Sequence, residues 1–261
     1  MTTATATKKT TKVLATGGPF DDSIWNHYRV TWRFVGKLCG STPFRKDMME
    51  GWLNSRTPSV RPPGGKSTLE IAEEVINRLP DMGEENKELE ERKTLVFQQV
   101  DRFYAIPANN IRAHLKDCTS QVQNQLVGKI KGERNFTTRV KNGLYVKGDT
   151  MDEAGTDVVF ISKNGDKISQ DKVNFDLNKV MPDRINFMEK TVHASSPQGP
   201  ISAIKRFAYI VQPEMTFIVS LLGNSVKLDD LVLVLKYGAT HGFGGERSAG
   251  EGKYVFEITE A

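Results

Sequence analysis

The stretch from Tyr237 to Tyr254 reads YGATHGFGGERSAGEGKY, and six of its 18 residues are glycine. It lies between a helix predicted at Leu228–Tyr237 and a final strand predicted at Lys253–Ile258. Its glycines follow the order Gly242-Phe243-Gly244, then five residues, then Gly250-Glu251-Gly252. Glycine permits positive φ and close backbone approach, so the N–H groups of this loop can converge on an anion. The alternative is a turn that only supports packing before the last strand.

Side chains in and beside this loop also suit an anionic ligand. Arg247 and Lys253 add positive charge, and Phe243 and Tyr254 are rings of the kind that stack on nucleic-acid bases. The loop is therefore the first candidate site, and its candidate residues are Gly242, Gly244, Gly245, Arg247, Gly250, Gly252 and Lys253.

Upstream, two stretches predict elements that would pack beside this loop. His27–Leu38 reads HYRVTWRFVGKL, and its alternation of apolar and polar residues predicts a first strand with a basic outer face. Ala108–Val127 predicts a helix. Its apolar residues at helical spacing are Ile111, Leu115, Cys118, Val122 and Leu126. We expect the other face of this helix to show Arg112, His114 and Lys116.

The rest of the chain predicts an α+β domain over residues 24–261. Residues 1–23 are rich in Thr, Ala, Lys and Gly, so we expect a flexible arm there. A short helix is predicted at Phe44–Leu53, and two more, at Ser67–Leu79 and Glu84–Arg92, predict a helical, acidic insertion at about 55–93. Further strands or hairpins are predicted at 95–106, 136–146, 157–161, 183–193, 201–211 and 215–222.

Charge is distributed unevenly along the chain. The whole sequence carries 36 Lys and Arg against 32 Asp and Glu, a net charge of +4. Residues 1–66 and 102–147 each have a balance of +7, whereas 67–92 has −6 and 148–261 has −4. Two basic blocks of this size predict a stripe that meets a polyanion, unless they are only a solvated surface.

Several classes of protein are excluded by what the sequence lacks. Its two cysteines, Cys39 and Cys118, exclude a disulfide scaffold and suit a reducing cytoplasm. Its four histidines show no metal-ligand spacing, so we expect no metal and no cofactor. The GKST at 65–68 lacks the first glycine of a phosphate loop, since that position is Val60. No stretch reaches the ~20 apolar residues of a membrane helix, so no membrane partner is expected.

Together, these motifs resemble the RAMP superfamily, the RNA-binding subunits of CRISPR effector complexes. The glycine order of the C-terminal loop, between a helix and a last strand, is similar to the family's glycine-rich loop, with Glu251 where an apolar residue is usual. Phe103–Arg112, FYAIPANNIR, resembles the family's IPGSSLKG strand-to-helix turn. Ala108, Asn109 and Asn110 replace the glycine and serines of that turn.

Two further stretches resemble those of stand-alone RAMP-like proteins of phages and prophages. LCGSTP at 38–43 is similar to their LxGSxP segment, and SSPQGPI at 195–201 to their TAQGxR segment. The resemblance implies a ferredoxin-like or RRM-like antiparallel sheet with helices on one face and insertions. It also implies non-catalytic binding of single-stranded RNA or DNA, RNA being the more expected, through contacts with the backbone of the strand.

Lysines and arginines would neutralise phosphates, so affinity should fall steeply with salt. Because backbone subunits of this family polymerise along a guide, the resemblance also implies copies of this chain or other effector subunits as partners, assembled head to tail. The candidate residues outside the loop are Lys37, Arg45, Lys46, Asn109, Asn110, Arg112 and Lys116. Arg139, Lys141 and Lys147, on the strand predicted at 136–146, come next.

Three alternatives remain open. One is an endoribonuclease on the same fold with His114 or Asp47 as general acid or base, which the absence of a histidine or metal cluster disfavours. Another is a phage-encoded protein-interaction module that mimics a CRISPR subunit, which the acidic segment 67–92 would support. The last is an enzyme that acts on nucleotides through its glycine-rich loop. A non-catalytic role is the favoured interpretation.

Overall fold

The computed structural model describes residues 24–43, 93–126, 135–148, 150–151, 155–196 and 199–261. Within them the chain is α+β, as the sequence predicts. Its helices are α4 (Ala108–Leu126), α5 (Phe136–Gly143), α6 (Leu228–His241) and the 3-10 turns η3 (Gly223–Ser225) and η4 (Arg247–Ala249). The predicted arm, the helix at 44–53 and nearly all of the predicted insertion lie outside the described residues, as do Arg45, Lys46 and Asp47.

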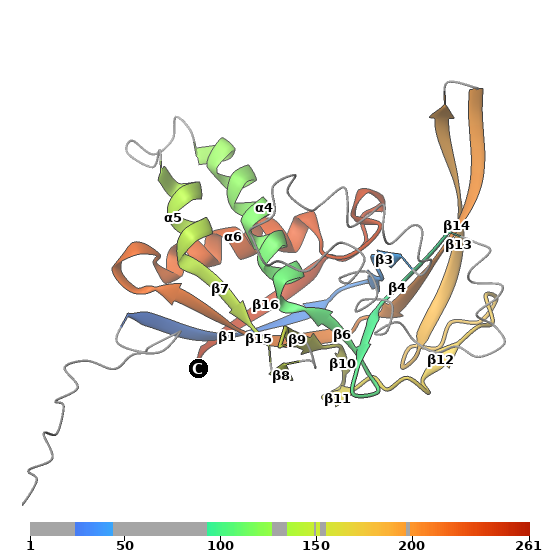
Figure 1. Cartoon of the computed structure of the whole chain (residues 1–261), viewed down its shortest axis with the longest axis horizontal. Coiled ribbons are helices and arrows are strands. Elements are labelled where there is room, and N and C mark those ends of the chain that lie inside the picture. The colour runs from blue at the N-terminus through green and yellow to red at the C-terminus, as the bar shows by residue number, and fades with distance from the viewer. Residues whose placement is uncertain (1–23, 44–92, 127–134, 149, 152–154, 197–198) are drawn as a thin grey trace, which may run out of the picture.

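The first sheet carries the helices on one face (Figure 1). The order β16–β1–β15–β7 is antiparallel throughout, and β10 with β11 pairs with the start of β15. Along the chain these elements run β1, α4, β7, β15, α6, β16. The strands are β1 (Trp25–Phe34), β7 (Leu144–Lys147), β10 (Ser162–Lys163), β11 (Asp166–Lys167), β15 (Glu214–Leu222) and β16 (Tyr254–Glu260).

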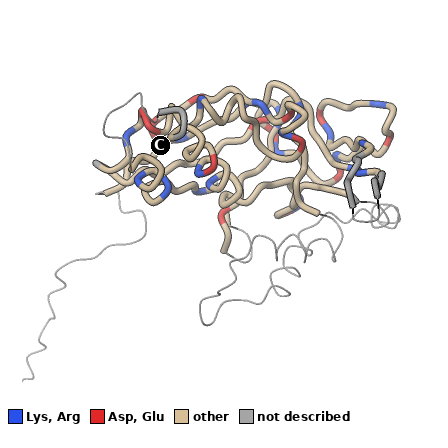
Figure 2. Tube along the Cα trace, turned by 90° about the horizontal axis from the view of Figure 1, so that it is seen from above, with Lys and Arg blue, Asp and Glu red and all other residues tan. Residues whose placement is uncertain are grey.

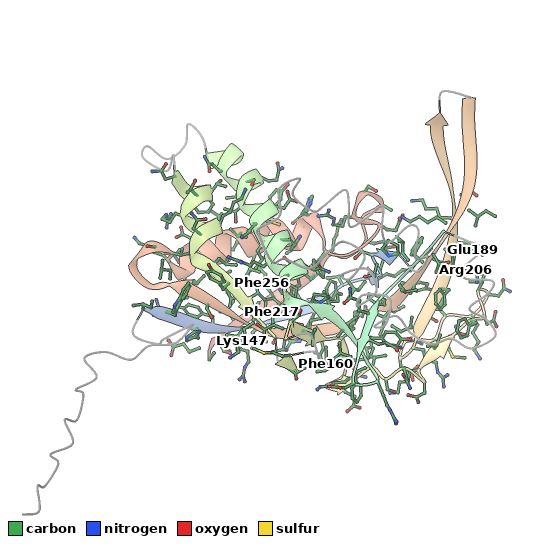
Figure 3. The ribbon with its side chains drawn as sticks, viewed as in Figure 1. Lys147, Phe160, Glu189, Arg206, Phe217 and Phe256 are labelled. Atoms are coloured by element: carbon green, nitrogen blue, oxygen red, sulfur yellow. The ribbon has the colours of Figure 1, made fainter. Side chains whose placement is uncertain are left out.

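The second sheet contains the two longest strands of the described chain. Its order is β12–β13–β14–β4–β3, with β2 also paired to β14. The strands are β2 (Lys37–Cys39), β3 (Thr42–Pro43), β4 (Lys93–Val96), β12 (Val173–Asn174), β13 (Ile185–Ser196) and β14 (Gly199–Val211). Figure 1 shows the β13–β14 hairpin standing clear of the other described elements, and Figure 3 shows Glu189 and Arg206 near its base.

A third, smaller sheet has the order β5–β6–β9–β8. Its β5–β6 hairpin confirms the predicted strand or hairpin at 95–106. The strands are β5 (Gln98–Val100), β6 (Phe103–Pro107), β8 (Thr150–Met151) and β9 (Asp157–Phe160). Because α4 starts directly after β6, this sheet fixes where α4 begins.

The main core lies between the first sheet and the helices. Val30, Trp32 and Phe34 alternate along β1 and are at most 3% exposed, as the two-residue period predicts. Trp32 stacks on Tyr254, with 4.2 Å between ring centres. The helices contribute Ile111, Leu115, Cys118, Val122, Leu231, Val234 and Leu235 to the same core.

Two predicted strands differ from the structure. His27–Leu38 breaks at Val35–Gly36 into β1 and β2, which belong to different sheets. The chain turns there because Gly36 O accepts from Gln212 N, which leads β2 onto β14. The stretch 136–146 is α5 followed by β7, because Phe136, Val140 and Gly143 are buried at helical spacing.

Candidate nucleic-acid interface

Three stretches that lie far apart in the sequence meet around one pocket of about 420 Å³. Ser41 and Thr42 come from the LCGSTP stretch, Asn110 from the strand-to-helix turn, and Gly244 and Arg247 from the glycine-rich loop. The sequence singled out these stretches separately. The structure brings them together.

The N-terminal half of α4 forms one wall of the pocket. Asn110, His114 and Asp117 line it, and their spacing places them on one face of the helix. The first turn of α4 contains no acidic residue. Because the first N–H groups of a helix lack partners within it and the dipole is positive there, this end of α4 suits an anion.

Hydrogen bonds fix the glycine-rich loop to β2. The N–H of Gly245 donates to Cys39 O and that of Gly252 to Lys37 O, both at 2.9 Å. Gly244 has a φ of +89°, and a Cβ there would lie 2.7 Å from Cys39 O, so only glycine fits. The loop thus forms a backbone-to-backbone contact with β2 that side chains would prevent.

Most amides of this loop donate within the protein. Those of residues 242, 243, 245 and 249–252 all donate to backbone carbonyl groups. These amides are therefore not directed at an anion, which supports the packing alternative for Gly242, Gly250 and Gly252.

Lysines beside the loop pair with its glutamates. Glu246 accepts from Lys205 at 2.6 Å and from Lys190 at 3.0 Å. Burial alone would raise the pKa of Glu246, but these two ammonium groups bring it below its usual range. Lys37 lies 3.9 Å from Glu251. Lys253 is exposed at the end of the loop, directly before β16.

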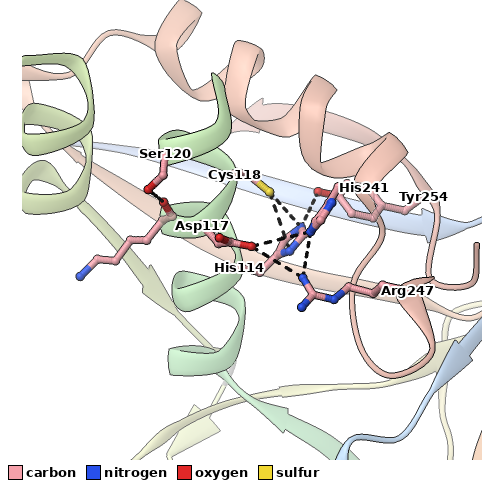
Figure 4. Close-up of polar contacts among 8 residues, drawn as sticks. His114, Asp117, Cys118, Ser120, His241, Arg247 and Tyr254 are labelled. Carbon is pink, nitrogen blue, oxygen red and sulfur yellow. Dashed lines mark hydrogen bonds and ion pairs between the residues drawn. The ribbon is translucent and has the colours of Figure 1, made fainter. Parts of the chain in front are cut away.

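Arg247 and Asp117 line the pocket, and Arg247 also contacts His241 (Figure 4). Its Nη1 donates to His241 Nε2 at 3.1 Å and lies 3.8 Å from Asp117 Oδ2. Side-chain exposure is 41% for Arg247 and 49% for Asp117. Exposed ion pairs of this kind contribute little free energy, so a phosphate group can replace Asp117 as the partner of the guanidinium.

His114 is buried, not exposed on a basic helix face as the sequence predicts. It is 5% exposed, and its Nε2 lies 3.3 Å from Tyr254 Oη. Burial, reinforced by Arg247 and His241, lowers the pKa of His114 to about 3. An imidazole with so low a pKa stays neutral near pH 7, which disfavours a general-acid role for His114.

A second group of cations lies where α4 passes α5. Partial burial lowers the pKa of Lys116, and the nearby charges of Arg112 and Lys141 lower it further. The Arg112 guanidinium lies 3.8 Å from the ring centre of Tyr145, and its Nε donates to Leu144 O at 2.9 Å. These three cations are brought together, but they lie outside the wall of the pocket.

The remaining predicted residues have varied surroundings. Arg139 lies on α5 rather than on a strand and pairs with Asp230. Tyr254 is 3% exposed and stacked on Trp32, so it is not free to stack on a base, whereas Phe243 lines the pocket. Asn109 and Lys147 are exposed.

Three residues at or beside the pocket were not predicted from the sequence. Gln98 and Asp117 line the pocket, and His241 contacts Arg247. Asp117 had a signal, because it follows Asn110 by seven residues on one helix face. His241 is the last residue of α6 and leads directly into the loop. Gln98 had no signal, since the pairing of β5 with β6 places it beside the pocket.

Within the part of the chain that the structure describes, no group of three or more His, Cys, Asp or Glu side chains could hold a metal ion. Nor does any described helix combine the length and apolar character needed to cross a membrane.

No protein-family model matches this sequence, and no curated protein matches it. Among solved structures, it is similar to a chain of the Type III-B Cmr-beta complex bound to cognate target RNA. That match has 9% identity and a TM-score of 0.39, and covers 92% of this chain but 62% of that one. A chain of a Type IV-B CRISPR complex matches with 11% identity and a TM-score of 0.37, over 89% and 90% of the two chains. Neither similarity says what this chain binds.

Proposed function

We propose that this chain is a non-catalytic RAMP-type protein that binds single-stranded nucleic acid, RNA above DNA, mainly through its backbone. One observation carries the proposal. The stretches at 38–43, 103–112 and 242–252, which resemble RAMP motifs, form one pocket although they are far apart in sequence.

The strand order supports a ferredoxin-like core for this protein. Strands β16–β1–β15–β7 are antiparallel, and along the chain these strands and the helices beside them run as β1, α4, α5, β7, β15, α6, β16, which is a strand–helix–strand–strand–helix–strand order with α5 as an extra helix. The β2, β3 and β4 strands and the long hairpin are then insertions around that core, and the pocket lies where they meet α4.

Charge around the pocket supports binding through phosphates. Arg247 and the start of α4 face one space, and Lys37 and Lys253 flank the loop. Arg112 and Lys116 lie further along α4, with Lys141 of α5 beside them, where the three can extend a phosphate path. Cations that neutralise phosphates release counterions, which makes affinity depend steeply on salt.

Fluorescence anisotropy with a labelled oligouridine strand, measured over a salt series, tests this proposal. We expect wild-type protein to bind and Arg247→Ala to weaken binding roughly tenfold at low salt, because a charged hydrogen-bond donor is lost. Loss of one phosphate contact should also reduce the salt slope by about 0.7.

Arg33→Ala is the matched control. Arg33 is also an exposed, paired arginine, but it lies on the face of β1 opposite to Trp32 and pairs with Glu257. Its loss should leave affinity unchanged. Absence of binding by the wild-type protein at low salt would overturn the proposal. Equal effects of the two substitutions would show that the pocket is not the binding site.

The projecting hairpin supports head-to-tail assembly along such a strand. Among the described residues, β12 pairs with the first two residues of β13, and β4 and β2 pair with β14 only from Lys205 onward. The remainder of β13 and β14 pair with each other. A two-stranded ribbon is marginally stable alone in water, so contact with a neighbouring copy would stabilise it.

A further inference from the structure

The interior of the pocket is built differently from its charged mouth. Phe97, Ile106 and Phe243 line it, and they are 3%, 8% and 6% exposed. A volume of about 420 Å³, with both apolar and polar side chains in its walls, lies in the range of pockets that enclose a small organic group, which span roughly 300–1,000 Å³. A surface that bound only phosphate groups would not require these apolar side chains.

Gln98 is the polar group that packing does not explain. It lines the pocket and is 5% exposed. Its Oε1 is buried and accepts no hydrogen bond from the described part of the chain. A buried acceptor without a donor costs about 1–3 kcal/mol. Its amide can turn about its last torsion, which has a broad preference, and present this oxygen to the pocket.

We propose that the pocket encloses one unstacked base of the bound strand, and that Gln98 selects a base with an exocyclic amino group, adenine first. This rests on the proposed function, because Arg247 would hold the phosphate beside that base. Glutamine pairs with adenine through two hydrogen bonds, in which the amide oxygen accepts from the amino group. Phe97 and Phe243 supply aromatic surface for the ring.

The test compares two labelled RNA pentamers by anisotropy. One is all adenosine and the other has purine riboside, which lacks the amino group, at every position. We expect wild-type protein to bind the adenosine pentamer about tenfold more tightly, since a buried acceptor stays unpaired in the other complex. Gln98→Leu should abolish this difference and leave the salt slope unchanged.

Gln121→Leu is the matched control, because Gln121 is exposed on α4 and does not line the pocket. It should keep the tenfold preference. Equal binding of the two pentamers by wild-type protein would overturn the base pocket and leave strand binding intact. Binding of neither would overturn the proposed function instead. Saturation-transfer NMR with free adenosine then decides the pocket: a signal lost in Gln98→Leu supports it, and no signal overturns it.

Thermal stability gives an independent readout. Gln98→Leu should raise the melting temperature, because it removes a buried acceptor that has no donor until a base is bound. A lower melting temperature would mean that Gln98 is a structural residue with a partner, which would overturn its role in selection.

Discussion

His114 illustrates how a polar residue of this chain serves the core. Its ring lies 5.7 Å from Trp32 and 5.3 Å from Phe243 between ring centres, both edge-on. Its Nε2 lies within hydrogen-bonding distance of Tyr254 Oη. One face of the pocket is therefore a neutral aromatic ring, which suits contact with a base better than contact with a phosphate.

We expect the imidazole of His114 to stay neutral in the folded protein through mildly acidic pH, since burial lowers its pKa to about 3. An unfolded histidine protonates near pH 6.5. The folded pKa is the lower one, so stability from this group is present above about pH 6.5 and is lost as pH falls towards 3. The loss is at most about 1.4 kcal/mol per pH unit.

NMR titration of the ring, with urea unfolding at neutral and mildly acidic pH, checks both statements. Titration of His114 near pH 6.5 would contradict the expectation.

At the scale of elements, α4 and α6 meet at Gly238. A Cβ at this position would lie 2.3 Å from Tyr254 Oη, 3.0 Å from His114 Nε2 and 3.3 Å from Cys118 Sγ. The missing side chain lets α6 pack against α4 and β16 at once. Since α6 leads into the glycine-rich loop, this contact also positions Arg247.

Gly238→Ala should therefore destabilise the protein, although alanine favours a helix by about 1 kcal/mol over glycine. The added methyl group overpacks the helix contact, which typically costs about 1–3 kcal/mol. Thermal unfolding measures the effect. Thr240→Ala, at an exposed position of the same helix, is the control and should be neutral or slightly stabilising. A rise in melting temperature for Gly238→Ala would contradict this expectation, because it would show that α4 and α6 can move apart to admit the methyl group.

Sequence periodicity was sufficient for elements with one clear buried face. It predicted α4, α6 and the strands that became β1, β13, β14 and β15. It failed at α5, since Thr and Val in FTTRVKNG favour strands locally and tertiary packing overrides that preference. It also placed His114 on the wrong face. His114 stands three residues after Ile111 and four before Cys118, so the same spacing indicates burial.

The sequence predicted separate parts of the candidate site but not their arrangement in space. The glycine-rich loop and the strand-to-helix turn were visible because glycine, proline and short polar residues mark turns. Their meeting with residues 38–43 was not visible, because it depends on β2 pairing with β14 and on the loop bonding β2. Nor could the sequence show whether a given amide of the loop is free to bind an anion or donates a hydrogen bond to β2.

At the scale of the whole molecule, the predicted basic stripe is interrupted. Figure 2 shows basic and acidic positions interleaved over the described chain. Arg33, Lys37 and Arg139 from the two basic blocks pair with carboxylates that come from the acidic C-terminal part. The uneven charge along the sequence is therefore partly balanced by ion pairs within the folded chain.

Light scattering of protein purified at low salt tests the assembly. We expect protein-only particles near 29.2 kDa and larger particles when a long single strand is bound, because copies would line up along it. Nuclease treatment should return the mass to that of one chain. Unchanged mass after nuclease would point to protein contacts alone, and a single-chain mass on a long strand would contradict head-to-tail assembly.

The β13–β14 hairpin also has a mechanical consequence. Strand β14 runs unbroken from Gly199, beyond the sheet, to Val211, where it pairs with β2. The glycine-rich loop is hydrogen-bonded to β2 through the amides of Gly245 and Gly252. Continuous backbone pairing therefore links the long hairpin, through β2, to the loop that carries Arg247. We expect a contact that displaces the hairpin to shift the pocket wall along this path.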